Sequence, residues 1–277
     1  MKKDDWKTTR LLQDSFLDTL SKLTDLFHYI AFSAGDDKEK YINDMRNFQN
    51  SEPFNSFVYS AVRRMVTPIA VQNMRTWRMA AKKATKNPSL YRMLMSEINQ
   101  GLKSDIEIQI EENASLIKTL PTDVAKKVTK DISDMALKGM RASEIAKVIR
   151  EQTDKHSRAS AKLIARTEVS KTTTALTKAR CDNLDLHWYV WRTMEDGDRV
   201  RKSHRIMEGV LVNWNEPPSP EALAGEKSVG NYHAGNIWNC RCYPEPLIEI
   251  DDISWPHKVY TNGKIQTMGK MQFKQMM

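Results

Sequence analysis

The sequence predicts an α+β protein that is mainly α, with a body of long helices followed by a small C-terminal module containing a few short antiparallel strands. Apolar residues recur every three or four positions through most of the first 180 residues, as on a helix face. Aromatic and β-branched segments, typical of strands, appear only after Leu186. With 277 residues, 40% hydrophobic and 28% charged, the chain is long enough to bury a core of one or two domains.

The first helix is expected from about Asp4 to Ser33. Its apolar residues follow one helix face, at Leu12, Phe16, Leu20, Leu23, Phe27 and Ile30. Gly35 interrupts this pattern, and Pro53 and Pro68 bracket a second helical stretch that resumes from Ile69 to about Thr85. Because proline lacks a backbone N–H, Pro68 is expected to kink or end a helix.

The next two helices are marked by prolines near their first turns. Pro88 opens a helix that continues toward Leu120 and is weakened locally by Gly101. Pro121 opens another, which Gly139 closes.

Ser143 has the character of an N-cap, which predicts a short helix to about Gln152. A longer helix is expected from Ser157 to about Asn183. The three consecutive β-branched residues at 172–174 interrupt its pattern, since such side chains are stiff in a helix.

The strands are expected in the C-terminal third. The segment 187–193 is aromatic and β-branched and precedes a turn at 195–198. Further strands are expected at 209–214 and 247–250, separated by a loop at 216–235 that contains Pro and Gly.

Composition narrows the class of protein. No segment approaches the roughly 20 apolar residues of a membrane-spanning helix, and the N-terminus lacks a signal-peptide pattern, so we expect a soluble protein and no membrane partner. Cys181, Cys240 and Cys242 are too few for a disulfide framework, which favours a reducing compartment. The net charge of +8 favours an acidic partner such as nucleic acid.

Four sequence elements occur in a fixed order in the C-terminal half. Their residues are Arg166, Thr167 and Glu168; Asp198, Arg201 and His204; Gly209; and Cys240, Arg241 and Cys242. Together they resemble the C-terminal module of the Mu F-like minor head proteins of phages, over roughly Gly139 to Pro246. We therefore expect three segments. The periodicity of apolar residues predicts a helical body at 1–138, the resemblance implies a Mu F-like head-morphogenesis module at 139–250, and the Met-rich composition favours a flexible tail at 251–277.

The resemblance also implies a function. It implies a non-enzymatic minor capsid protein, present in few copies, that is made in the host cytoplasm and ends in the virion, inside the capsid near the portal vertex. The expected partner is the portal protein, contacted through the helical body, with the scaffold or major capsid protein and DNA as further candidates. Some members of this family bind DNA or affect genome delivery, so the resemblance also makes these properties candidates for this chain.

The charged motif residues allow two interpretations. Arg166 and Glu168 are two apart on a helix and point in different directions, so they either tie the helix to the Asp198–Arg201 turn or are solvated charges. Arg199 and Arg201 are expected to share one face of an extended segment and suit phosphate or carboxylate. The alternative is a turn held by an Asp–Arg pair.

Two thiols and two imidazoles, those of His204, His233, Cys240 and Cys242, match the donor types of tetrahedral zinc. The alternative is that the cysteines are small buried residues and the histidines donate core hydrogen bonds. A rival function is a metal-assisted nuclease using Asp198, His204 and His233 to activate water. That set lacks a second carboxylate, and the sequence contains neither G-x-S-x-G nor H-E-x-x-H.

The densest basic segment comprises Arg63, Arg64, Arg75, Arg78, Lys82, Lys83 and Lys86, with Trp77 among them. It is interpreted either as a helix that contacts nucleic acid or the portal, with Trp77 stacking on bases, or as a solvated face. The second rival function is therefore a nonspecific DNA-binding protein.

Overall fold

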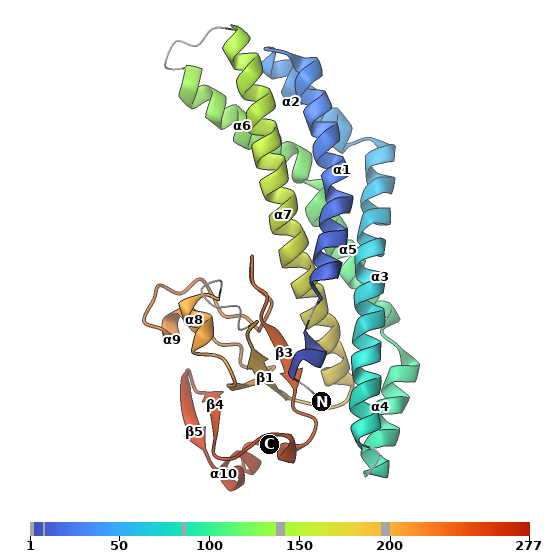
Figure 1. Ribbon diagram of the computed structural model, residues 1–277, viewed down its shortest axis with the longest axis vertical. Coiled ribbons are helices and arrows are strands. Elements are labelled where there is room, and N and C mark those ends of the chain that lie inside the picture. The colour runs from blue at the N-terminus through green and yellow to red at the C-terminus, as the bar shows by residue number, and fades with distance from the viewer. Residues whose placement is uncertain (1–2, 8, 85–86, 137–141, 195–199) are drawn as a thin grey trace. The chain divides into compact units, whose positions relative to one another are not determined.

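The computed structural model describes residues 3–7, 9–84, 87–136, 142–194 and 200–277 (Figure 1). Most of these residues are helical, and the later part of the chain adds a five-stranded sheet. The fold is therefore α+β and mainly α, as predicted from the sequence.

The elements follow one another with short connections. The long helices are α1 Arg10–Ala34, α2 Lys38–Gln49, α3 Glu52–Lys83, α4 Pro88–Gln100, α5 Lys103–Lys118, α6 Leu120–Ala136 and α7 Ala142–Asn183. The short helical turns are η1 Lys3–Trp6, α8 Lys202–Arg205, α9 Pro220–Leu223, η4 Ile250–Asp252 and α10 Lys270–Lys274. The strands are β1 Trp188–Arg192, β2 Leu211–Asn213, β3 Tyr243–Pro246, β4 His257–Thr261 and β5 Lys264–Met268.

The chain divides into two compact units, each made of separate stretches of sequence. Unit 1 comprises Met1–Thr9, Pro68–Ile106 and Val169–Met277. Unit 2 comprises Arg10–Thr67 and Glu107–Glu168. The long helices α3 and α7 contribute residues to both units, so each unit draws on the chain before and after position 138.

Unit 2 is helical throughout. The face of α1 predicted from the sequence is buried at Phe16, Leu20, Leu23 and Phe27. Aliphatic side chains supply most of the other buried residues of this unit, as expected for helices that pack through apolar stripes. One buried polar contact joins the Tyr41 hydroxyl to that of Thr153 at 2.8 Å, and burial raises the pKa of Tyr41 to about 12.

Pro68 lies inside α3 and does not end it, so that part of the expectation is wrong. Proline removes one backbone hydrogen bond and costs a helix interior about 3 kcal/mol. On either side of it, Val66 and Ile69 are buried. Burying two large aliphatic side chains contributes about 3–6 kcal/mol, which offsets that cost.

Two further helix boundaries differ from the predictions. Gly101 ends α4 with φ of 75°, and its N–H bonds to the carbonyl of Glu97, so the stretch from Pro88 to Leu120 is two helices. In contrast, α7 runs unbroken through the β-branched triplet. The Thr173 hydroxyl donates to the Val169 carbonyl at 2.8 Å, which satisfies it within the helix. The expected closure at Gly139 lies outside the described residues.

The sheet in unit 1 has the strand order β3-β1-β2-β4-β5. Strands β1–β2, β1–β3 and β4–β5 pair antiparallel, but β2 and β4 pair parallel. The sheet is therefore mixed, whereas the sequence predicted antiparallel strands only. The strand predicted at 247–250 is also wrong, because β3 precedes it and contains Pro244 and Pro246. Those prolines are tolerated because β3 is an edge strand.

The segment after residue 251 is not a flexible tail. It forms β4, β5 and α10, and β4 pairs with β2 at Leu211 and Val259. Phe273 of α10 is fully buried and packs edge-on against Trp188, with ring centroids 4.9 Å apart. These contacts cover one face of the sheet.

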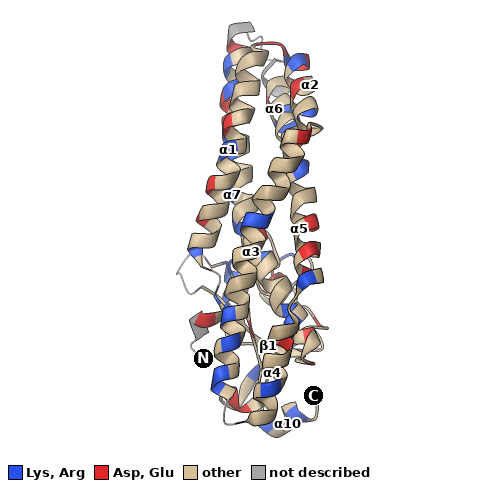
Figure 2. Cartoon of the chain, turned by 90° about the vertical axis from the view of Figure 1, so that its right-hand side faces the viewer, with Lys and Arg blue, Asp and Glu red and all other residues tan. Residues whose placement is uncertain are grey.

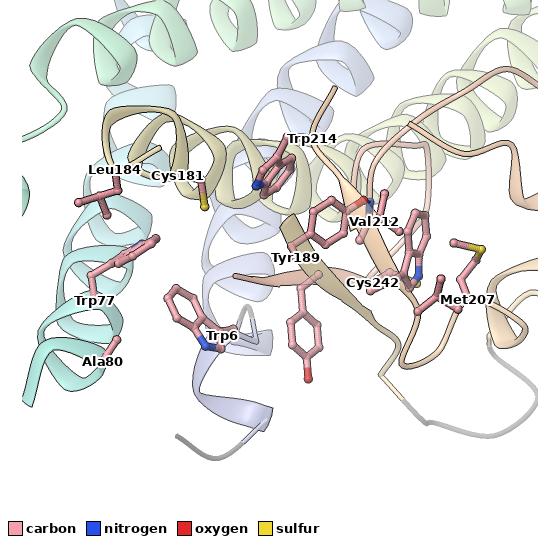
Figure 3. Packing of buried hydrophobic residues seen from close by; sticks show 14 of the residues in the cluster. Trp6, Trp77, Ala80, Cys181, Leu184, Tyr189, Met207, Val212, Trp214 and Cys242 are labelled. Carbon is pink, nitrogen blue, oxygen red and sulfur yellow. The ribbon is translucent and has the colours of Figure 1, made fainter. Parts of the chain in front are cut away.

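Alternate residues of β1 face two different hydrophobic clusters. Trp188 and Val190 pack with the C-terminal elements, whereas Tyr189 and Trp191 enter a larger aromatic core. That core also holds Trp6 and Trp77, which meet edge to face with centroids 5.1 Å apart (Figure 3). Because successive side chains of a strand point to opposite faces, these two clusters cover both faces of β1.

Candidate metal centre

One histidine and two cysteines gather in the interior of unit 1. The residues His204, Cys240 and Cys242 are only 2%, 4% and 6% exposed. The Nδ1 atom of His204 lies 3.5 Å from the Cys240 sulfur and 3.4 Å from the Cys242 sulfur. All three potential ligand atoms lie within 4.8 Å of one another.

The backbone brings these side chains together from two parts of unit 1. His204 belongs to the short helix α8, after which Gly209 turns with φ of 76° and donates its N–H to the Trp191 carbonyl at 2.9 Å. The cysteines immediately precede β3 and are two residues apart, and the Cys242 backbone N–H donates to the Cys240 sulfur at 3.3 Å.

A hydrogen-bonded chain lies behind the histidine. Tyr232 donates its hydroxyl hydrogen to the Glu221 carboxylate at 2.7 Å, and the same hydroxyl lies 2.9 Å from Nε2 of His204. Because the tyrosine hydrogen is directed to Glu221, its oxygen accepts a hydrogen from Nε2. The other ring nitrogen, Nδ1, faces the two sulfur atoms.

The two thiols titrate unequally. The hydrogen bond from Cys242 lowers the pKa of Cys240 well below its ordinary value, with His204 acting in the same direction. The hydrogen bond to Cys240, followed by burial, raises the pKa of Cys242. The first proton of the pair therefore leaves Cys240.

Gly235 sits where no larger residue fits. A Cβ atom there would lie 2.7 Å from both the Cys242 carbonyl oxygen and the Thr174 hydroxyl, and the residue has φ of 82°. Thr174 also donates to the Ala234 carbonyl at 2.8 Å. This close approach holds the loop before the cysteines against α7.

Residues 126–244 match the family described as "Phage Mu protein F like protein". This part of the chain is similar to the phage Mu F-like proteins. The matched region contains the cluster and all of the motif residues, so the resemblance expected from the sequence is confirmed, and the family points to phage head morphogenesis.

A curated relative is similar over part of the chain. A Haemophilus influenzae (strain ATCC 51907 / DSM 11121 / KW20 / Rd) protein described as "Uncharacterized protein" is 28% identical over 140 residues. The alignment covers 50% of this chain and 29% of that relative, so the chain spans less than a third of the relative's length. No solved structure matches the chain.

His233 does not join the other three predicted zinc ligands. Its Nδ1 atom lies 3.2 Å from the Tyr189 hydroxyl, and its ring packs on Trp214 with centroids 5.0 Å apart. Adjacent residues of an extended loop point to opposite sides, and Tyr232 takes the side of the cluster. Burial and the nearby Lys178 lower the pKa of His233 to about 4.

The predicted nuclease set is likewise not assembled among the described residues. His204 and His233 contact different groups, and Asp198 lies outside the part of the chain that the structure describes. The third cysteine, Cys181, is buried elsewhere in unit 1, where burial raises its pKa.

The remaining motif residues have different environments. Arg201 donates to the Trp238 carbonyl at 2.8 Å and its guanidinium lies 5.7 Å from the centre of the Trp238 ring. Arg166 is half-buried, and Thr167 and Glu168 are buried in unit 2. The predicted link from Arg166 and Glu168 to the turn at Asp198 stays a prediction, as does the paired face of Arg199 and Arg201, since Arg199 is also outside the described residues.

The basic segment of α3 is exposed but its tryptophan is not. The exposed cations are Arg63, Arg64, Arg75, Arg78, Lys82 and Lys83, and Figure 2 shows Lys and Arg along this helix. Trp77 is fully buried against Trp6, so the expectation that it stacks on bases is wrong. Arg63 lies 3.7 Å from Glu107, and Lys86 falls outside the described residues. Within the described ranges, no helix has the length and apolar character needed to cross a membrane.

Sequence reasoning found the histidine and both cysteines but missed Glu221, Tyr232 and Gly235. These three residues have no spacing relation to the cysteines and come from the loop region that the sequence marks only by its Pro and Gly content. The one available signal was the presence of Gly235 just ahead of the cysteine pair.

Proposed function

We propose that this chain is a minor head protein that acts in phage head morphogenesis, bound to the portal protein inside the procapsid. The observation that carries the proposal is the Mu F-like match over residues 126–244. The role we propose is structural, in assembling and completing the portal vertex, and it places the chain in the capsid interior of the virion.

An exposed apolar face of α1 is our candidate for the portal contact. Leu26, Tyr29 and Phe32 are 46%, 68% and 62% exposed and follow one another at helical spacing. They lie opposite the face that is buried in unit 2. Because exposed apolar patches on helices mark protein-binding surfaces, this face suits a groove or helix of a partner.

The portal contact can be tested with the full-length chain and the portal protein encoded by the same genome. We expect the intact chain to be captured by the portal, and replacement of Leu26, Tyr29 and Phe32 by Ser to weaken capture at least about tenfold. The control carries Ser at Ile108, Leu116 and Leu163, which are also exposed apolar residues of unit 2. No capture of the intact chain contradicts the partnership; equal capture by all three proteins contradicts this surface.

Assembly into particles needs a separate measurement. Mass spectrometry of purified procapsids and virions is expected to detect the chain in low copy number, and deletion of its gene is expected to reduce the yield of infectious heads. Absence of the chain from both particles would overturn the proposed role.

The exposed cations of α3 favour DNA contact as a second property. Arg75, Arg78 and Lys82 are spaced three and four residues apart, which places their charges along one stripe, and Lys83 adjoins them. Cations that neutralise phosphates release counterions, so duplex binding is expected to weaken steeply with salt.

Replacing Arg75, Arg78, Lys82 and Lys83 by Gln is expected to reduce the slope of log K against log salt by about 3–4 for duplex DNA. Affinity should not depend on DNA sequence. A variant with Lys126, Lys127, Lys130 and Lys147 replaced by Gln has the same change in net charge and serves as the control. Equal slopes for the two variants would identify the α3 cations as a solvated face.

A further inference from the structure

We infer that His204, Cys240 and Cys242 bind one zinc ion that ties α8 to the segment leading into β3. This site is independent of the proposed role in head assembly. It also differs from the four-ligand set suggested by the sequence, because His233 is directed elsewhere.

The first argument is the spacing of the donor atoms. With zinc about 2.3 Å from sulfur and about 2.0–2.1 Å from nitrogen, tetrahedral angles separate the two ligand atoms by about 3.6 Å. The His204 Nδ1 atom lies 3.5 Å from one sulfur and 3.4 Å from the other. One nitrogen at this distance from two sulfur atoms is the arrangement that a shared ion requires.

The second argument is the orientation of the imidazole. The chain from Glu221 through Tyr232 supplies a hydrogen-bond acceptor to Nε2 of His204, which leaves Nδ1 free to donate its lone pair. Histidine ligands of metals commonly have such a partner on the second ring nitrogen, often ending in a carboxylate, and it fixes both tautomer and ring position.

The donor set also selects the kind of ion. Two thiolates and one imidazole are soft to borderline donors, which suit zinc and exclude magnesium and calcium. Zinc compensates the charge of thiolates buried beside Trp191 and Tyr232, which water reaches poorly. Three donors come from described residues, so a tetrahedral ion needs one further ligand, which we expect to be a nitrogen or oxygen atom.

Metal content of matched variants tests the assignment. The proteins are expressed in zinc-supplemented medium and dialysed before their metal content is measured. Because the proposed site binds one ion, about one zinc per chain is expected in the wild type and in the variants Cys181→Ala and His233→Asn. Cys240→Ala, Cys242→Ala and His204→Asn should contain little. A zinc-free wild type that takes up none from added zinc chloride would overturn the site, and so would loss of zinc from His233→Asn to the same extent as from His204→Asn.

Spectroscopy of the wild type keeps the proposal testable even if a cysteine variant fails to fold. Cobalt(II) added to the metal-free full-length chain should give thiolate-to-cobalt charge-transfer absorption, and X-ray absorption of the zinc form should report two sulfur and two lighter ligands. Absence of the charge-transfer band at excess cobalt contradicts the site.

The role of Glu221 in positioning His204 through Tyr232 is tested by measuring the affinity for zinc in competition with a chelator. Glu221→Gln should weaken binding about 10–100-fold, whereas the exposed Glu226→Gln on the same loop should leave it unchanged. Equal affinities in these two variants would show that Glu221 does not position the histidine.

Discussion

The two units of this chain are stabilised by different kinds of contact. Unit 2 buries apolar helix faces, and its His28–Asp154 pair lies at the surface with side chains 48% and 36% exposed. Unit 1 buries aromatic residues together with an ion pair, and the side chains of Glu97 and Arg180 are both only 4% exposed. An exposed pair contributes little to stability, whereas a buried charge depends on its partner. We therefore expect substitution of the buried pair in unit 1 to destabilise the protein far more than substitution of the exposed pair in unit 2.

Both members of the buried pair in unit 1 have a further hydrogen-bond partner. Arg180 donates to the Glu97 carboxylate at 2.5 Å and to the Asn73 side-chain oxygen at 2.7 Å, and Asn183 donates to Glu97 at 3.3 Å. These contacts join α3, α4 and α7 within unit 1. Removing the Glu97 carboxylate is therefore the strongest test of the difference between the buried pair of unit 1 and the exposed pair of unit 2.

The largest effect is expected from Glu97→Ala, which leaves the Arg180 charge buried without its carboxylate. The free energy of unfolding should fall by about 3–5 kcal/mol, measured by denaturant titration. The matched change in the exposed pair of unit 2, Asp154→Asn, should cost at most about 1 kcal/mol. Similar losses of stability in the two variants would contradict the predicted difference between the buried and the exposed pair.

A double variant sharpens this prediction. Glu97→Met with Arg180→Met replaces both charges by apolar groups of similar length, and it should recover most of the stability lost in Glu97→Ala. If the double variant is as unstable as the single one, the packing around the pair, not the unpaired charge, accounts for the loss.

The next effect is a pH dependence from His233 in unit 1. Its pKa falls from 6.5 to about 4 on folding because burial disfavours the imidazolium. Between these values the unfolded chain binds a proton that the folded chain does not, so stability falls as the pH is lowered from 6.5 toward 4. The contribution is at most about 3 kcal/mol. His233→Asn should flatten the unfolding free energy in this window relative to the wild type; an unchanged pH profile would contradict the assignment.

The smallest effect concerns the packing of the cysteine loop on α7. Gly235→Ala places a methyl group against the Cys242 carbonyl and the Thr174 hydroxyl, and we expect a loss of about 2 kcal/mol beyond that of Gly225→Ala. Gly225 has a similar positive φ but nothing within 4 Å of its Cβ position, so it reports the cost of backbone conformation alone. Equal melting temperatures would show that the loop yields to the methyl group.

The sequence by itself determined the features that depend on local patterns. The buried face of α1 followed from apolar residues at spacings of three and four, and β1 followed from a β-branched and aromatic run. Cys240 and Cys242, two apart in an extended segment, were predicted as donors from residue type alone. The ordered motif residues were enough for the Mu F-like resemblance that the family match confirms.

Other features depend on contacts between residues far apart in the chain and could not be predicted from local patterns. Burial around Pro68 keeps α3 continuous, and the edge position of β3 accommodates prolines that argue against a strand. The tertiary structure also decided that Tyr232 and not His233 faces His204, and that Trp77 is buried. The physical reason is that these outcomes depend on contacts between residues far apart in the chain, whose free energies exceed the local preferences of about 1–3 kcal/mol that a sequence pattern reports.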